Sequence, residues 1–465
     1  MKFYNTLTRQ RDEFTPLEGN TVRIYSCGPT VYSYAHIGNM RTYVFMDLLR
    51  RALKYNGYEL KHVMNITDVG HLVSDGDDGE DKMAKTAREQ KKTPWEIAEY
   101  YTSVFMKDID ALNITRPEII AKATEHIGEM IDFVQGLDKN GYAYETSDGI
   151  YYDIAKFDRY GMLSGNKLDE QKAGARVELN SEKRHPADFA LWKKAPKEHI
   201  MQWESPWGMG YPGWHIECSA MGLKYLGKYF DIHTGGVDHI PIHHENEIAQ
   251  SCGLLGNEAA KFWIHGEFVL VDGGKMSKSL SNTYTISQLS EKGYDPLDFR
   301  YFCLNAHYRQ KLNFTFEGMD SAKKSLTKLR AAVARHKGEK GSVQPVAAFM
   351  AEFEDAINDD LNIPKALGVV WSMARCDDRS QAMYDAIMKC DSVLALDLDR
   401  EIKEEDAPAD VDSDLASYVE EQIALRAEAK KAKNYAEADR IRAELAEKGI
   451  TLTDTPQGVK WSVNN

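Results

Sequence analysis

The chain has 465 residues, of which 43% are hydrophobic, and this is typical of a globular protein with about three domains. Its formal net charge of −14 argues against a protein that coats nucleic acid indiscriminately, because such binding depends on neutralising phosphates. No apolar run approaches the length of a membrane span, the six cysteines show no paired framework and no secretory leader pattern opens the chain, so we expect a cytoplasmic protein.

The amino-terminal part predicts a strand, a helix and a second strand. The segment 21–32 alternates apolar residues and then meets Cys-Gly-Pro, which is typical of a strand that ends in a turn. Apolar residues recur at helical spacing from about Asn39 to Asn56, and the segment 58–68 predicts another strand. Such a unit builds a doubly wound parallel sheet, which binds ligands at the carboxyl ends of its strands.

The middle of the chain mixes loops with strands. The acidic stretch 74–81 predicts a solvated loop, and the region from about 110 to 200 predicts an insertion between two halves of the sheet domain. The segment 203–220 is rich in Trp, Gly and Pro, a composition that suits the wall of a pocket. The segments 230–236 and 268–279 both begin as strands, and the second leads into a lysine-bearing loop.

The carboxy-terminal part is mainly helical. The pattern from about Ser321 to Leu396 predicts packed helices, and the acidic, proline-bearing stretch 401–413 predicts a linker. Two further helices, broken near Asn434, precede apolar residues that alternate on either side of Pro-Gln-Gly, which indicates a β-hairpin.

Together these elements predict an α/β fold in three parts. The first is a doubly wound parallel, Rossmann-type domain at 1–320, interrupted by the insertion at about 110–200. The other two are a helical bundle at 321–400 and a small α+β domain at 414–465.

Two short motifs suit a phosphate ligand. His-Ile-Gly-Asn at 36–39 stands where a strand turns into a helix, and the backbone N–H groups and helix dipole there attract phosphate. Lys-Met-Ser-Lys-Ser at 275–279 follows Gly273 and Gly274 and predicts a mobile cationic loop that closes on a triphosphate. Taken singly, the first motif also fits a helix-capping histidine and the second a solvated lysine turn.

Four separated residues offer two thiols, an imidazole and a carboxylate: Cys27, Cys218, His243 and Glu247. The spacing of four between His243 and Glu247 puts both on one helical face, and zinc accepts this mixture of donors. We therefore predict one zinc ion per chain, either structural or part of an active site. Glu245 is the competitor for the place of Glu247, and we expect Glu245 and His244 to lie behind the ligands or at the surface.

The two phosphate motifs together resemble those of the class I aminoacyl-tRNA synthetases. The segments CGPTVY, GWHIECSAM, HHENEIAQS and the terminal AKNYAEADRIRAEL and GITLTDTPQGVKW are similar in order and spacing to the cysteinyl-tRNA synthetases, over essentially the whole chain. The resemblance implies an enzyme that activates L-cysteine with ATP and Mg²⁺ to cysteinyl-adenylate, releases pyrophosphate and transfers cysteine to the 3′ end of tRNA(Cys).

The resemblance also implies roles for single residues, with the four residues above as zinc ligands. Contacts to the substrate are implied for Gly28, Thr30, Trp214 and His233. ATP binding is implied for His36, Asn39, Gly235, Gly236, Asp238 and Lys278, and a catalytic role for His36, Asn39, Lys275 and Lys278.

The sequence departs from the family pattern in two places. Asn39 replaces the last histidine of the HIGH motif, which keeps a hydrogen-bonding group but removes the chance of a positive charge. Pro241 and Ile242 stand where the family usually shows Phe-Pro, which puts the start of the following helix in doubt.

An enzyme that activates cysteine must reject serine, which differs only by oxygen for sulfur. An apolar pocket separates such near-isosteres poorly. Zinc favours a thiolate and lowers the pKa of a bound thiol, so we expect the metal to recognise the substrate sulfur.

The carboxy-terminal domain resembles the anticodon-binding domain of the family. Its helices carry the cations Arg426, Lys430, Lys431, Lys433, Arg440 and Arg442. Trp461 is suited to stack on a base, which favours RNA over a merely solvated helix face. We expect a monomer. The alternatives are a ligase that passes cysteine to a small amine and a synthetase-derived RNA-binding protein without enzymatic activity.

Overall fold

The computed structural model describes seven stretches of the chain, which are residues 1–70, 81–166, 182–276, 282–402, 413–431, 434–455 and 458–463. The chain divides into two compact units, Met1–Ile402 and Lys403–Asn465. Most of the predicted acidic loop, Lys278 with its neighbours 277–281, and most of the predicted linker lie outside the described residues. None of the helices in the described part of the chain is long and apolar enough to cross a membrane.

The first unit is built on a five-stranded parallel sheet in the order β11-β10-β3-β4-β5. Its strands are β3 (Thr21–Ser26), β4 (Glu59–Ile66), β5 (Ile119–Lys122), β10 (Phe230–Gly236) and β11 (Ala260–Gly266). Every residue of β10 is buried, as expected for a central parallel strand that is covered on both faces. The chain moves outwards in opposite directions from β3 and β10, and ligands bind at the carboxyl ends of strands where the order reverses in this way. The predicted Rossmann-type sheet is confirmed.

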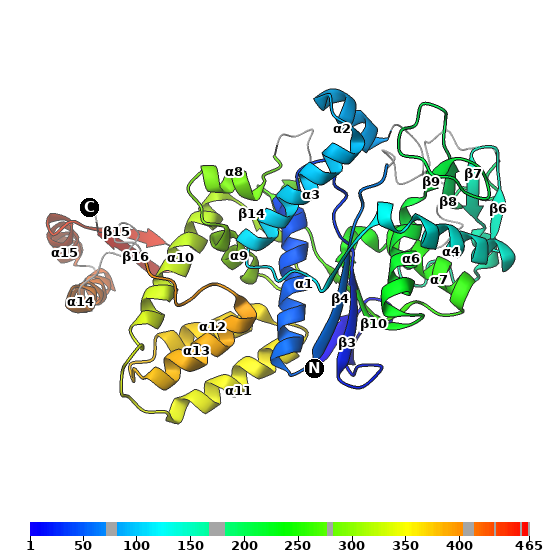
Figure 1. Cartoon of the computed structure of the whole chain (residues 1–465). Helices are drawn as coiled ribbons and strands as arrows, with labels where there is room; N and C mark the ends of the chain where they lie inside the picture. Colours follow the sequence, from blue (N-terminus) through cyan, green and yellow to red (C-terminus); the bar gives the residue numbers. More distant parts are fainter. Residues whose placement is uncertain are drawn as a thin grey trace. The chain divides into compact units, whose positions relative to one another are not determined.

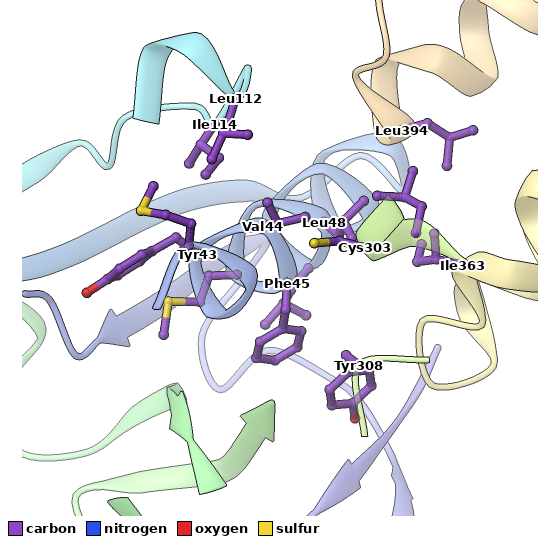
Figure 2. Close-up of a cluster of buried hydrophobic side chains, with 14 of the residues drawn as sticks. Tyr43, Val44, Phe45, Leu48, Leu112, Ile114, Cys303, Tyr308, Ile363 and Leu394 are labelled. Atoms are coloured by element: carbon purple, nitrogen blue, oxygen red, sulfur yellow. The ribbon is translucent and has the colours of Figure 1, made fainter. Parts of the chain in front are cut away.

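Helix α1 (Ile37–Tyr55) joins β3 to β4 and lies at the centre of the unit (Figure 1). Its bounds agree with the predicted helix from about Asn39 to Asn56 to within two residues. Apolar side chains from the chain near Leu112, from near Cys303 and from near Leu394 surround it (Figure 2). Each large side chain buried in this way contributes about 1.5–3 kcal/mol to stability, which makes α1 the axis of the core.

An antiparallel sheet interrupts the parallel one between β5 and β10. Its order is β6-β7-β8-β9, with β6 (Ala143–Glu145), β7 (Gly149–Tyr152), β8 (Phe189–Lys194) and β9 (Gly210–Pro212). It shares a core with α4 (Ile127–Lys139), α6 (Trp214–Leu226) and α7 (His243–Leu255). The insertion expected at about 110–200 therefore overlaps the parallel sheet at β5 and stops short of β9.

Among the described residues, a small sheet and six helices complete the carboxy-terminal half of the first unit. The strands, in the order β13-β12-β14, are β12 (Val269–Val271), β13 (Gly274–Lys275) and β14 (Leu312–Phe314). The helices are α8 (Ile286–Glu291), α9 (Pro296–Leu304), α10 (Phe316–Ala334), α11 (Gln344–Asn358), α12 (Ile363–Ala374) and α13 (Gln381–Leu394), which follow α7 in the chain. The bundle α10–α13 shares its hydrophobic core with α1 and α9, so it belongs to the same compact unit as the sheet.

The first unit also contains several further elements. They are the antiparallel pair β1 (Lys2–Asn5) and β2 (Gln10–Glu13), the helices α2 (Lys82–Gln90) and α3 (Pro94–Ala111), and the short helices η1 (Ala123–Glu125), η2 (Ile154–Lys156) and η3 (Val237–His239).

The second unit contains two helices and a hairpin. Its elements are α14 (Ser413–Lys431), α15 (Tyr435–Glu447), β15 (Ile450–Thr455) and β16 (Gly458–Val463). The strands pair antiparallel, with Ile450 opposite Val463 and Leu452 opposite Trp461, which confirms the predicted hairpin. Val419, Ile441 and Leu445 pack with Ile450 and Leu452 in a small core, so alternate strand residues face the helices.

Candidate active site and metal centre

The predicted site residues gather at the carboxyl ends of β3 and β10. Cys27 directly follows β3, and Gly235 and Gly236 end β10. Helix α6 carries Trp214 and Cys218, and helix α7 carries His243 and Glu247. Segments far apart in the sequence therefore meet where a doubly wound sheet holds its ligands.

The four predicted zinc ligands form one buried cluster. The Sγ atoms of Cys27 and Cys218, a ring nitrogen of His243 and a carboxylate oxygen of Glu247 all lie within 4.8 Å of one another. A second, overlapping group also meets this limit and combines Cys27 and Glu247 with His233 and His244. Hydrogen bonding distinguishes the two groups.

In the first group, the ligand atoms are held towards the centre of the cluster by neighbours behind them. Nδ1 of His243 is hydrogen-bonded to Nδ1 of His215 at 2.9 Å, and Oε2 of Glu247 to Nε2 of His233 at 2.9 Å. Nε2 of His243 and Oε1 of Glu247 are left facing each other at 3.0 Å. Oε1 of Glu247 is buried and has no hydrogen-bond partner among the described residues, as a metal-binding oxygen would be.

In the second group, both ring nitrogens of His244 already have partners. Its Nε2 lies 3.1 Å from Sγ of Cys27, and its Nδ1 is 2.7 Å from Nε2 of His265. His265 in turn contacts Oγ1 of Thr6 at 2.7 Å. His244 is therefore placed to orient the Cys27 thiol, and the geometry favours the group of Cys27, Cys218, His243 and Glu247 as ligands.

The ionisation of the side chains in the cluster favours the binding of a cation. Burial opposes ionisation of Cys218, but its hydrogen bond with Cys27 and the nearby His243 outweigh burial and lower the pKa of the Cys218 thiol to about 6. Burial likewise raises the pKa of Glu247, but His233 and His243 overcome it and hold this pKa at about 2. Against the effect of burial, Glu247 and Cys218 raise the pKa of His243 to about 10. Two anionic ligands thus face one protonated imidazole, whose proton a zinc ion would replace.

Glu245 has a different environment from Glu247. Its carboxylate accepts hydrogen bonds from the backbone N–H groups of Gly161, Leu163 and Ser164 at 2.9, 3.1 and 2.8 Å. It therefore binds a turn of the insertion, and it belongs to neither of the two potential metal-binding groups.

A cavity of about 280 Å³ extends from Cys27 to the start of α1. The predicted site residues that line it are Cys27, Gly28, Thr30, His36, Asn39, Trp214, Gly236 and Asp238. Those that are described but do not line it are Cys218, His233, Gly235, His243 and Glu247. The metal cluster thus reaches the cavity through Cys27, and Trp214 packs over the His243 ring at 4.7 Å between centroids.

His36 and Asn39 cap α1 reciprocally. The Asn39 backbone N–H donates to Nδ1 of His36 at 3.2 Å, and the His36 N–H donates to Oδ1 of Asn39 at 3.1 Å. Because Nδ1 is an acceptor, the neutral His36 ring carries its proton on Nε2. The helix-capping interpretation is correct, and the same two hydrogen bonds orient His36 at the cavity. The side-chain oxygen of Asn39 therefore helps to hold His36 at the start of α1.

Two glycines allow close backbone approaches beside the cavity. A Cβ on Gly28 would lie 1.6 Å from the carbonyl oxygen of Asn65, whose side-chain oxygen accepts from the Gly28 N–H at 2.8 Å. A Cβ on Gly235 would lie 2.6 Å from His239 and 2.7 Å from His244. A side chain at either position would displace the backbone or the histidines.

Helix α7 begins at His243, directly after Pro241 and Ile242. The unusual Pro-Ile pair therefore leaves both ligands within the helix. Lys275 lies in β13, and its side chain, like all of Lys278, lies outside the part of the chain that the structure describes.

Sequence reasoning missed the histidines that support the ligands and one wall of the cavity. His215 and His265 were not singled out, and Lys82, Tyr101 and Phe105 line the cavity from α2 and α3. His215 is three residues before Cys218 and so lies on the same helical face, which is a signal that spacing alone could have revealed.

Comparisons with known proteins agree with this geometry. Residues 13–324 match the family model described as the tRNA synthetases class I (C) catalytic domain, and residues 352–394 match the DALR domain. The chain is 46% identical to cysteine–tRNA ligase 1 of Burkholderia lata over 98% of this chain and 96% of that protein. It is 42% identical to the cysteine–tRNA ligase of Treponema denticola over 99% of each. The structure of Mycobacterium tuberculosis methionyl-tRNA synthetase with methionyl-adenylate is similar in fold, with a TM-score of 0.57 at 14% identity over 81% of this chain and 90% of that one.

Proposed function

This chain belongs to the cysteinyl-tRNA synthetases, the cysteine–tRNA ligases of class I, and from that premise we propose how its own residues select and activate cysteine. Its substrates are cysteine, ATP and tRNA(Cys). The observation that carries the proposal is that Cys27 belongs both to the buried metal cluster and to the wall of the cavity that extends to His36 and Asn39.

Cys27, Cys218, His243 and Glu247 hold one zinc ion. When bound, zinc supplies a position that favours a thiolate over a hydroxyl. His215 and His233 fix the His243 ring and the Glu247 carboxylate, and His244 fixes Cys27. Gly28, Thr30 and Trp214 enclose the cysteine substrate beside Cys27, because all three line the cavity at that end.

Activation takes place at the other end of the cavity. A carboxylate oxygen of cysteine attacks the α-phosphorus of ATP, and pyrophosphate leaves, with Mg²⁺ on the phosphates. His36, whose neutral ring carries its proton on Nε2, donates to a phosphate oxygen, and Asn39 holds that ring in place. Gly236 and Asp238 line the cavity and border the nucleotide, Gly235 remains a predicted contact to ATP, and His233 acts through Glu247. Lys275 and Lys278 remain predicted contacts to ATP.

Transfer completes the reaction. A ribose hydroxyl at the 3′ end of the tRNA attacks the carbonyl carbon of the adenylate, and AMP leaves. We further propose that the enzyme acts as a monomer in the cytoplasm and that the second unit, Lys403–Asn465, binds the anticodon end of the tRNA.

The test is cysteine-dependent ATP–pyrophosphate exchange followed by charging of the tRNA(Cys) transcript. Both activities are expected, and a variant with Cys27→Ser should lose exchange, because it keeps the wall of the cavity but replaces a thiolate ligand by a hydroxyl that binds zinc poorly. Exchange without charging would instead favour a ligase that acts on a small amine.

A further inference from the structure

One wall of the cavity comes from residues that the proposed chemistry does not use. The loop before α1 contributes Tyr32 and Tyr34, α2 contributes Lys82, and α3 contributes Tyr101 and Phe105. Phe105 packs edge-on against Tyr43 of α1 at 4.9 Å between centroids, which places α3 beside the start of that helix (Figure 1). This wall therefore borders the same end of the cavity as the His36 cap.

Exposed aromatic rings continue from this wall to the surface. Tyr34 is 46% exposed and Tyr100 is 40% exposed, and their hydroxyls are hydrogen-bonded at 2.8 Å. Tyr34 also meets Tyr101 edge-on at 5.0 Å between centroids. Large aromatic side chains that pack together and stay half exposed present their faces and edges to a ligand.

Cations accompany these rings. Nζ of Lys82 lies 5.5 Å above the Tyr32 ring, and Nζ of Lys92 lies 4.9 Å above the Tyr100 ring. We call Tyr32, Tyr34, Tyr100, Lys82 and Lys92 the aromatic rim.

The basic charge of the aromatic rim is local. Residues 82–92 contain five basic side chains, at 82, 85, 88, 91 and 92, against one acidic side chain at 89, whereas the acidic stretch 74–81 directly precedes them and the whole chain has a net charge of −14. Acidic residues do follow on α3, but the carboxylate of Glu96 accepts hydrogen bonds from the N–H and hydroxyl of Thr93. A basic stretch next to a cluster of half-exposed aromatic rings is typical of surfaces that bind single-stranded nucleic acid.

We propose that the aromatic rim binds the unpaired 3′ end of the tRNA and guides its terminal ribose into the cavity. The proposal rests on the proposed function, since only a tRNA substrate must bring a single-stranded end to the adenylate. Tyr34 and Tyr100 stack on unpaired bases, which expose a face whatever their sequence, and Lys82 and Lys92 neutralise the adjoining phosphates. The adenine of ATP is the competing occupant, and the test separates the two.

The decisive experiment is a double-mutant cycle between protein and RNA. Binding of tRNA(Cys) transcripts with an intact or a truncated 3′ tail is measured by fluorescence anisotropy for the wild type, Tyr34→Ala and Lys92→Ala. Tail truncation should weaken wild-type binding on the order of 5- to 150-fold for each base that stacks, and clearly less in either variant. Tyr34→Phe keeps the ring and should behave as the wild type. Lys228→Ala is the matched charge control, because Lys228 lies at the amino end of β10 and so at the opposite edge of the sheet.

Exchange and charging give a second readout on the same proteins. Tyr34→Ala and Lys92→Ala should keep cysteine-dependent ATP–pyrophosphate exchange, which also shows that they are folded, and should charge tRNA more slowly. Equal effects of tail truncation in variants and wild type would overturn the proposal, as would exchange that falls in step with charging, since the rim would then hold ATP. Wild-type protein without cysteine-dependent exchange would instead contradict the proposed function itself.

Discussion

Glu245 and Glu247 lie two residues apart on α7, yet their carboxylates have different partners. Glu247 shares its two oxygens between His233 and the metal cluster, whereas Glu245 accepts three backbone N–H groups from a turn of the insertion. The same side chain therefore serves metal binding at one position and the positioning of a loop at the other.

The two glutamates provide a matched pair of variants. Glu247→Gln should lower zinc content well below one ion per chain, because it removes an anionic ligand. Glu245→Gln should keep the zinc and instead lower the unfolding temperature, because a neutral amide replaces a charge-assisted acceptor of three N–H groups. Atomic absorption and thermal unfolding of both purified variants check this. Zinc loss in the Glu245 variant alone would contradict the ligand assignment.

Helical spacing placed Glu247 rather than Glu245 beside His243, but it did not show what Glu245 binds. A separation of four residues placed His243 and Glu247 on one helical face. The position of Glu245 depends on Gly161, Leu163 and Ser164, which lie more than 80 residues away along the chain, and nothing local encodes that contact. His244 was expected behind the ligands or at the surface, and it contacts Cys27, whereas His265 was missed because its partners Thr6 and His244 are remote in sequence.

Helix α1 and strand β5 show how much the sequence pattern of a single element can predict. The periodicity of α1 predicted its bounds closely, because the helix is amphipathic and carries its own caps. Strand β5 was not predicted within the insertion, since a strand of four residues offers too little alternation to recognise. Its place in the sheet comes from parallel pairing with β4.

Asp108, near the carboxyl end of α3, makes a prediction about pH. Burial raises the pKa of its carboxyl to about 6, so the folded protein holds the proton more tightly than the unfolded chain. This contribution to stability is complete below about pH 4 and is lost as the pH rises through 6. Asp108→Asn should therefore increase the free energy of unfolding at pH 8 by up to about 3 kcal/mol, with a gain that shrinks towards pH 5.

Asp110, two residues further on, is the control for this prediction. The pKa of its carboxyl is lowered by a hydrogen bond from Arg116, so Asp110→Asn should leave stability unchanged or reduce it slightly at pH 8. Urea unfolding of both variants at pH 5 and pH 8 measures the difference. A loss of stability in Asp108→Asn at both values would show that the carboxylate has a stabilising partner when ionised.

The whole protein has a net negative charge, and the tRNA that it binds is also negatively charged. The net charge of −14 makes binding depend on local basic surfaces, and we expect these at residues 82–92 in the first unit and at Lys430 and Lys431, at the carboxy-terminal end of α14, in the second. Composition alone did not identify the fold or the reaction. The ordered motifs did, and the relatives cover 98% and 99% of the chain.

The second unit should contribute to tRNA recognition without affecting adenylate formation. Replacing Lys430 and Lys431 on α14 by Gln should raise KM for tRNA in charging several-fold, because each removed phosphate contact weakens binding. The rate of ATP–pyrophosphate exchange should stay at the wild-type value. Equal losses in both assays would refute the assignment of this unit to tRNA binding.

We propose that a zinc ion bound by Cys27, Cys218, His243 and Glu247 distinguishes cysteine from serine. The most direct measurement is ATP–pyrophosphate exchange with each amino acid, before and after zinc is removed by a chelator and then restored. We expect the metal-free enzyme to lose most of its preference for cysteine over serine, and we expect added zinc to restore that preference. An unchanged preference in verified metal-free protein would contradict the claim and leave the zinc a structural role.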